Sequence, residues 1–298
     1  MNQTQTARPS RQTVLADLGL LYTSAIWGST FILVKNSLAF IDPVVMVAYR
    51  FLLAALLTGA VLGWRRRPLL KDFRPGLILG LAQMFLYIPQ TIGLKFTTAA
   101  NSGFITGLFV AFIPPLLLLF RIEKPRPKQW LAVAVSLAGL WLVTGGLDNV
   151  NLGDLITLSA AFTYAVHVLL TDRYANSSTD HLRLVFQQFL VVGVLSLLAA
   201  ALFGRPLQVS ALQGIGAVVF LALFPTLSAF LIQVKAQTIT APIKVALIFA
   251  LEPVFAGIFA WTVGRETFSP LNALGGLLVF LAVVLSTLPE RKPALNGP

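Results

Sequence analysis

Residues 43–67 read PVVMVAYRFLLAALLTGAVLGWRRR, a long apolar run that ends in three consecutive arginines. A helix needs about 20 mainly apolar residues to cross the hydrocarbon core of a bilayer, and Lys and Arg collect in the loops on the cytoplasmic side. The stretch therefore predicts a membrane-spanning helix whose C-terminal end faces the cytoplasm. Arg50 is its only charged residue before the arginine run.

The rest of the chain has the same apolar character. Of its 298 residues, 57% are hydrophobic and 11% are charged. Soluble proteins carry roughly 25% charged residues. The mean hydropathy of +0.83 leaves too little polar surface to solvate a soluble domain. This composition excludes a soluble fold and predicts a multi-pass membrane protein.

The apolar stretches divide the chain into ten predicted transmembrane helices. Their polarity does not alternate with a period of two, as it would in the strands of a membrane barrel. The spans are 15–35, 43–63, 74–94, 98–120, 128–146, 152–171, 182–203, 211–233, 241–262 and 270–288. We expect Pro89 and the pair Pro114-Pro115 to interrupt their helices. The polar start of the chain lacks the features of a cleavable signal peptide.

Basic residues lie in every second connection between these spans. On one side are Arg8, Arg11, Arg65, Arg66, Arg67, Lys71, Arg74, Arg121, Lys124, Arg126, Lys128, Arg173, Arg183, Lys235, Lys244, Arg291 and Lys292, and on the other Lys35, Lys95, Arg205 and Arg265. By the positive-inside rule, the N-terminal tail 1–14 and the C-terminal tail 289–298 are both cytoplasmic, in a plasma or bacterial inner membrane. This distribution explains the net charge of +11, so we expect no nucleic-acid partner.

The two halves of the chain correspond when one is shifted by 143 residues. The matched pairs include Thr97–Thr240, Glu123–Glu266 and Pro127–Pro270. Each half holds five spans, an odd number, so the second copy must insert upside down. The predicted repeats are 15–147 and 148–288. Inverted repeats are typical of secondary transporters, whose substrate site lies near the membrane midplane between the halves.

Short motifs follow one another along most of the chain. They are Trp27-Gly28-Ser29, Tyr49-Arg50-Phe51, Leu94-Lys95-Phe96-Thr97-Thr98-Ala99, Leu251-Glu252-Pro253-Val254-Phe255 and Gly264-Arg265-Glu266. In order and spacing they resemble the EamA group of the drug/metabolite transporter superfamily. That group usually has Gly-Glu before the fifth span, where this chain has Ile122-Glu123. The resemblance implies ten helices around a central cavity and export of small organic molecules such as amino acids, metabolites or drugs.

Polar residues within a span are costly and therefore face other helices or a water-filled cavity. Gln83, Tyr87 and Gln90 share one face of the third span, at positions i, i+4 and i+7. They could form a wall that binds substrate, or they could form hydrogen bonds between helices. The remaining candidates for the cavity are Trp27, Phe31, Asn101, Thr163, Tyr164 and His167.

Glu252 and His167 are candidates for coupling or gating. His167 could carry a coupled proton, or it could be a neutral histidine with a structural role. Glu252 lies near the middle of the ninth span, and Pro253 after it disrupts the backbone hydrogen-bond ladder. Glu252 could bind a proton or a substrate amine; we favour a structural or gating role in the broken helix.

Two further basic residues lie within the spans. Arg50 could attract an anionic group of the substrate, but we expect it to extend to the outer interface. Lys244 occupies the position that matches Asn101 in the other half. We expect Lys244 to extend to the inner interface.

Several activities are excluded by what the sequence lacks. It contains no cysteine and only two histidines, so disulfides, thiolate chemistry and a rich metal cluster are excluded. It has no Walker motif, so ATP cannot drive it directly. We expect no cofactor, no metal and no enzymatic activity.

The sequence therefore predicts an all-α secondary transporter that exports a small organic solute by alternating access. We expect it to act as a monomer or homodimer. A membrane-embedded enzyme and a membrane scaffold or sensor are the alternatives. A polar cavity between the halves would favour transport, and a dry, closed bundle would favour a scaffold.

Overall fold

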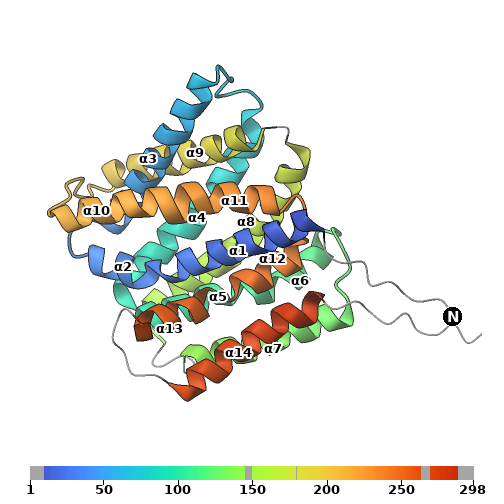
Figure 1. The fold of residues 1–298 in the computed structure, drawn as a ribbon. Coiled ribbons are helices and arrows are strands. Elements are labelled where there is room, and N and C mark those ends of the chain that lie inside the picture. Colours follow the sequence, from blue (N-terminus) through green and yellow to red (C-terminus); the bar gives the residue numbers. More distant parts are fainter. Residues whose placement is uncertain (1–9, 145–149, 179, 263–268, 288–298) are drawn as a thin grey trace, which may run out of the picture.

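The computed structural model describes residues 10–144, 150–178, 180–262 and 269–287. Within these ranges every regular element is helical, with fourteen α-helices and one π-helix (Figure 1). Eight helical segments are long and apolar enough to cross a membrane, and residues 270–286 form a shorter apolar helix. The tail 289–298, most of the tail 1–14 and the Gly264-Arg265-Glu266 motif lie outside the described residues.

The helices form ten rods at the predicted places. In the first half these are α1 (Arg11–Gly28) with α2 (Thr30–Ser37), α3 (Pro43–Trp64), α4 (Phe73–Phe96), α5 (Ala99–Gly107) with α6 (Phe109–Leu119), and α7 (Pro127–Thr144). In the second half they are α8 (Leu152–Ser177), α9 (His181–Leu202), α10 (Leu212–Leu221) with η1 (Ala222–Ser228) and α11 (Ala229–Ala236), α12 (Pro242–Phe249) with α13 (Glu252–Thr262), and α14 (Pro270–Thr287). The prediction of an all-α membrane fold is confirmed.

The outer surface of the bundle is apolar along the rods. Leu56 and Leu198 are exposed, as are Phe85 and Phe280. In water such a surface would drive aggregation, but lipid tails are as apolar as these side chains. The surface therefore fits a protein whose solvent is a bilayer.

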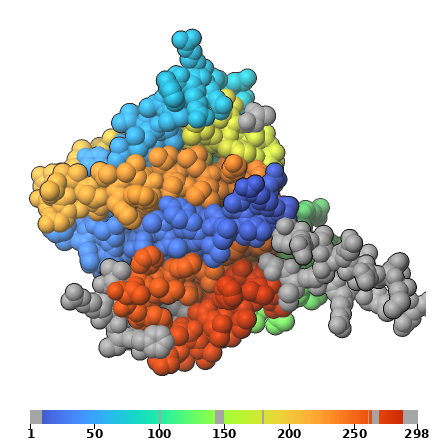
Figure 2. Space-filling model, viewed as in Figure 1, coloured from blue at the N-terminus to red at the C-terminus, as the bar shows by residue number. Residues whose placement is uncertain are grey.

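The two halves pack against each other in antiparallel pairs. Along α3 and α9, Gly59 lies against Phe186 and Gly193 lies against Leu52, so one residue number rises as the other falls. The rods α1–α2 and α10–η1–α11 also lie side by side, as the blue and orange bands in Figure 2 show. Because α3 and α9 are the second helices of their halves, an antiparallel pair of them means that one half is inverted.

The other helix pairs show the same symmetry, in which each helix of one half takes the place of its counterpart in the other half. The third rod, α4, packs along the sixth, α8, and the first rod packs along the eighth. Exchanging the halves converts one of these pairs into the other. The fifth and tenth rods, α7 and α14, pair with each other in the same way (Figure 1). The predicted arrangement of two inverted repeats is confirmed.

The helix breaks do not fall where prolines alone predict them. Pro89 lies inside a continuous α4, and Pro114 and Pro115 lie inside α6, so the predicted interruptions there are wrong. Pro89 cannot donate to the carbonyl of Phe85. The hydroxyl of Thr163 on α8 lies 3.0 Å from that carbonyl oxygen and shares its hydrogen between it and the carbonyls of Ser159 and Ala160 in its own helix, also at 3.0 Å. A neighbouring helix thus supplies the missing donor, as the membrane interior requires.

Four rods are divided near their middle. The first divides at Ser29, the fourth at Leu108 and the ninth at Ala250–Leu251, while the eighth passes through η1 around Pro225. These divisions place helix ends inside the bundle rather than at its surface. Two of them, at Ser29 and at Ala250–Leu251, flank the candidate site.

We predict that Gly93→Ala destabilises the protein by about 1–3 kcal/mol, as overpacking does. A Cβ atom at Gly93 would lie 2.3 Å from Thr157 Oγ1 and 2.6 Å from the carbonyl oxygen of Gly153. A backbone carbonyl of α8 cannot rotate away, so α4 and α8 must separate. Thermal unfolding in detergent measures the effect. Gly63→Ala is the matched control because nothing lies within 4 Å of its Cβ position; equal melting temperatures for the two variants would contradict the prediction.

Candidate functional site

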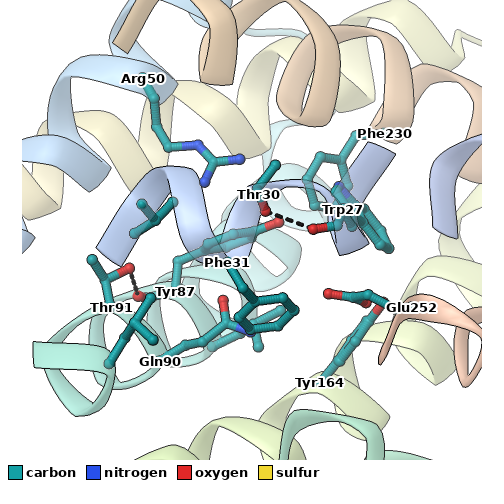
Figure 3. Close-up of a pocket in the computed structure, with 13 residues that line it drawn as sticks. Trp27, Thr30, Phe31, Arg50, Tyr87, Gln90, Thr91, Tyr164, Phe230 and Glu252 are labelled. Carbon is teal, nitrogen blue, oxygen red and sulfur yellow. Dashed lines mark hydrogen bonds between the residues drawn. The ribbon is translucent and has the colours of Figure 1, made fainter. Parts of the chain in front are cut away.

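A pocket lies between the two halves, beside the broken first and ninth rods (Figure 3). Its volume is about 550 Å³, including the part open to solvent. The part of it wide enough to hold the centre of a water molecule measures about 30 Å³, so the pocket is narrow in this conformation. The lining residues come from both repeats: Trp27, Thr30, Phe31, Val34, Arg50, Leu86, Tyr87, Gln90, Thr91, Leu94, Tyr164, Phe230 and Glu252.

Aromatic rings form much of the pocket wall and hold one another in place. The ring of Trp27 packs 5.3 Å from that of Phe230 and 6.0 Å from that of Tyr164, centroid to centroid. The indole Nε1 of Trp27 donates to the carbonyl oxygen of Pro225 at 2.7 Å, within η1. This bond fixes the ring and gives a partner to a buried carbonyl in the irregular part of the eighth rod. The wall is therefore pre-formed.

Arg50 points into the pocket rather than to the outer interface, so the sequence-based expectation for it is wrong. Its side chain is buried, with 4% of the residue exposed, and its Nε donates to Thr226 Oγ1 at 2.9 Å. Its guanidinium carbon lies 4.7 Å from the centroid of the Tyr87 ring. A hydroxyl and an aromatic face inside the bundle stabilise the cation there. Arg50 is therefore stabilised inside the bundle and does not extend to the membrane interface.

Glu252 is the acid of the pocket. It begins α13 and is 6% exposed, and its carboxylate lies apart from the guanidinium of Arg50 across the aromatic residues (Figure 3). The first turn of a helix favours a negative charge. Ion pairs within the described residues involve Arg67, Arg183, Asp72, Asp180, Lys244 and Asp17. The pocket thus holds one basic and one acidic side chain without an ion pair between them.

Six of the residues predicted from sequence line this pocket. They are Trp27, Phe31, Tyr87, Gln90, Tyr164 and Glu252. Gln90 also donates from its amide nitrogen to Thr106 Oγ1 at 3.1 Å, which orients it from α5. These residues come from four different rods, and the packing of α4 on α8 brings the two central tyrosines to the same space.

The structure places five other candidates elsewhere. Gln83 and His167 are fully buried beneath the pocket, and Asn101 lies in the first turn of α5. Thr163 bonds to the carbonyl that Pro89 leaves free, and Pro253 packs beside Gly107. The face shared by Gln83, Tyr87 and Gln90 is therefore divided. Tyr87 and Gln90 reach the pocket. Gln83 lies beneath the rings of Trp27 and Phe230, which we call the aromatic floor.

Several lining residues were not predicted from the sequence. Thr30 and Val34 continue the helical stripe that starts at Trp27, and Thr91 and Leu94 continue the stripe of Tyr87 and Gln90. The spacing could have revealed these four. Phe230 gave no such signal, because it is one apolar residue among many in an apolar span.

Polar contacts close the bundle at both ends. At the pocket end, Lys35 Nζ donates to the carbonyl oxygens of Leu94 and Thr97, both at 2.7 Å. The hydroxyl of Thr97 donates to Asp154 Oδ1 at 2.5 Å. At the opposite end, Lys244 pairs with Asp17 at 2.7 Å instead of extending freely to the interface.

The described residues hold no group of three or more His, Asp or Glu side chains placed to bind a metal ion. The ionisable groups of the pocket are the single pair Arg50 and Glu252 together with two tyrosines. This set suits recognition of a charged solute.

Two inverted helical repeats with a pocket between them define a membrane transporter of the inverted-repeat class. The sequence model of the EamA-like transporter family matches both halves, at residues 14–145 and 151–288. The chain therefore belongs to the EamA-like transporter family, as its motifs predict.

Individual relatives agree with this assignment. An "Uncharacterized transporter" of Archaeoglobus fulgidus is 31% identical over 274 residues, covering 92% of this chain and 86% of that protein. The "Uncharacterized inner membrane transporter YedA" of Escherichia coli K12 is 29% identical over 278 residues, covering 88% and 87%. A protein of known crystal structure shares the fold, with a TM-score of 0.76 at 22% identity over 91% of this chain and 96% of its own. The protein is a multi-pass membrane transporter.

We predict that Trp27→Phe destabilises the protein by about 1–3 kcal/mol, the usual cost of a buried polar group left without its partner. The substitution keeps an aromatic ring but removes the donor to the Pro225 carbonyl. Thermal unfolding in detergent measures the loss. Trp141→Phe is the control because Trp141 is 53% exposed on α7. If both variants melt at the temperature of the parent, the indole bond does not hold η1 in place.

Proposed function

We propose that the protein exports a small amphoteric organic solute, such as an amino acid or a related metabolite, by alternating access. The observation that carries this proposal is a basic and an acidic side chain, Arg50 and Glu252, at separate places in one aromatic pocket. A solute with a carboxylate and an amine, joined by an apolar body, matches the three parts of this pocket.

Electrostatics support a solute of this kind. A buried charge without a counter-charge costs several kcal/mol, which an oppositely charged ligand group would offset. Arg50 presents a planar donor group suited to a carboxylate, and Glu252 suits an ammonium group. The rings of Trp27, Tyr87 and Phe230 would pack on the apolar part. Amphipathic drugs with the same charges are a second solute class for the site.

The distribution of basic residues supports an orientation with both termini in the cytoplasm of an inner or plasma membrane. Under this proposal the repeats are 15–147 and 148–288, the tails are cytoplasmic, and the pocket lies in the outer half of the membrane. The polar pocket between the halves favours transport over a scaffold or sensor. The few ionisable groups in it favour transport over catalysis.

We predict that Arg50→Gln weakens the binding of zwitterionic solutes at least ~10-fold, as the loss of a charge-assisted hydrogen bond implies. Amines that lack a carboxylate should bind with nearly unchanged affinity. Uptake and efflux by purified protein in liposomes, against a panel of amino acids and amines, measures both. Arg205→Gln is the control because Arg205 lies exposed in the connection after α9. Equal losses for solutes with and without a carboxylate would contradict this role of Arg50.

We predict the reciprocal result for Glu252→Gln. The amide keeps the shape but cannot carry a negative charge, so the variant should fold, and solutes with an amine should bind at least ~10-fold more weakly. Glu123→Gln, between α6 and α7, is the control. The same liposome assays test a second role of Glu252, as the carrier of a coupled proton. If it carries a coupled proton, transport driven by a pH gradient fails while exchange of solute persists. Loss of folding would contradict both roles.

A further inference from the structure

A second polar group lies beneath the pocket, one helical turn further from its mouth. On α1 and α4, Ser24 precedes Trp27 and Gln83 precedes Tyr87. On α8 and α11, which run in the opposite direction, His167 follows Tyr164 and Gln233 follows Phe230. The same pattern therefore occurs on four rods. On each, an aromatic residue lines the pocket and a polar residue lies one helical turn deeper on the same face.

Gln188 of α9 joins this group through the 3.3 Å contact between its Oε1 and His167 Nε2. We call these residues the inner polar layer: Ser24, Gln83, His167, Gln188 and Gln233. All five are fully buried at 0% exposure. The layer belongs to both repeats, as the pocket does.

Much of the hydrogen-bonding capacity of the inner polar layer is unused within the described part of the protein. Ser24 Oγ, both amide atoms of Gln83, His167 Nδ1, Gln188 Nε2 and Gln233 Oε1 have no protein partner there. Each buried polar group without a partner costs about 1–3 kcal/mol. Apolar side chains of similar size would pack this region more stably, so packing alone does not explain five such residues.

Aromatic rings separate this layer from the pocket. The Phe230 ring lies 6.1 Å from the ring of Tyr87 on the pocket side and 5.8 Å from the ring of His167 on the other side. Phe230 is the second residue after η1, and Trp27 lies two residues before the break at Ser29. Helix breaks and π-turns are places where segments can move relative to each other. The rings that separate the two polar regions are therefore attached to the movable parts of two rods.

We propose that the inner polar layer lines the other half of the solute path, which the aromatic floor closes in this conformation. This inference rests on the proposed transport function. When the floor parts, the five side chains would contact water and the polar groups of the solute, and the ion pair between Lys244 and Asp17 at that end would open. The pocket and the layer would then be exposed to opposite sides of the membrane in turn.

The chain contains no cysteine, so single cysteines test this directly. We would place one at Gln90 in the pocket, one at Gln83 and one at Gln233 in the layer, and react oriented vesicles from each side with a membrane-impermeant maleimide. Ser136→Cys on α7 is the control, because Ser136 is equally buried and polar but lies outside the layer.

We expect the cysteine at Gln90 to react from one side and those at Gln83 and Gln233 to react from the other, at least ~10-fold faster than the control. If the two layer cysteines react as slowly as the control, or from the same side as the cysteine at Gln90, the inference is overturned. The melting temperature of each single-cysteine variant verifies that it is folded.

A second variant tests the closing contact. Lys244→Met removes the ion pair with Asp17 and should raise the labelling rate at Gln83 several-fold, whereas an unchanged rate overturns the role given to that contact. Labelling requires no knowledge of the solute. The proposed substrate class and the proposed role of the inner polar layer can therefore fail separately. Opposite-side labelling without transport of any tested solute would reject the proposed substrate class. Transport without labelling of the layer would reject this inference.

Discussion

The fold depends on one constraint, that backbone polar groups inside a membrane must find partners within the protein. Unbroken helices meet it automatically, but this chain interrupts four of its ten rods. At one of these breaks, at a proline inside the unbroken α4 and at the C-terminal end of α4, side chains from other rods supply donors. Trp27 donates to the carbonyl of Pro225, Thr163 to that of Phe85, and Lys35 to two carbonyls at the end of α4. Each of these bonds also joins two different rods.

These hydrogen bonds between rods lie on either side of the pocket. The bond from Trp27 holds the first rod against the eighth, and the bond from Thr163 holds the third against the sixth. The inverted repeat exchanges these two pairs, so they flank one central space. The side chains that bond to these carbonyls thus also connect the rods on either side of the pocket. Its two charges enter from α3 and α13, which pack outside these pairs.

The sequence predicts the rods well because the signal is strong and local. Apolar length and loop charge fix each span, and a cap such as Asp42 before Pro43 marks where a helix starts. The site is harder to predict, because the direction of a side chain depends on partners far away in the chain. Arg50 is the clearest example. Its partner Thr226 is 176 residues away, and nothing near Arg50 indicates that a hydroxyl will meet it.

Helical spacing also has a limit that Gln83 illustrates. The sequence shows that Gln83, Tyr87 and Gln90 share a face, and they do. It does not show that the rings of Phe51 and Phe230, from other rods, pack against Tyr87 and divide that face. The spacing of residues along one helix therefore predicts which way their side chains point around the helix axis. How deep a cavity extends along that helix depends on side chains from the other helices of the bundle.

The two ends of the bundle are closed by different chemistry although the halves are repeats. One end uses an ammonium group on backbone carbonyls, and the other uses an ammonium–carboxylate pair. Dissolved ions screen the second contact more strongly than the first, because both of its partners carry full charge. Under the proposed alternating access, the two access states would then differ in energy by an amount that ionic strength can change. The cell's own salt composition would therefore help to set the resting balance between them.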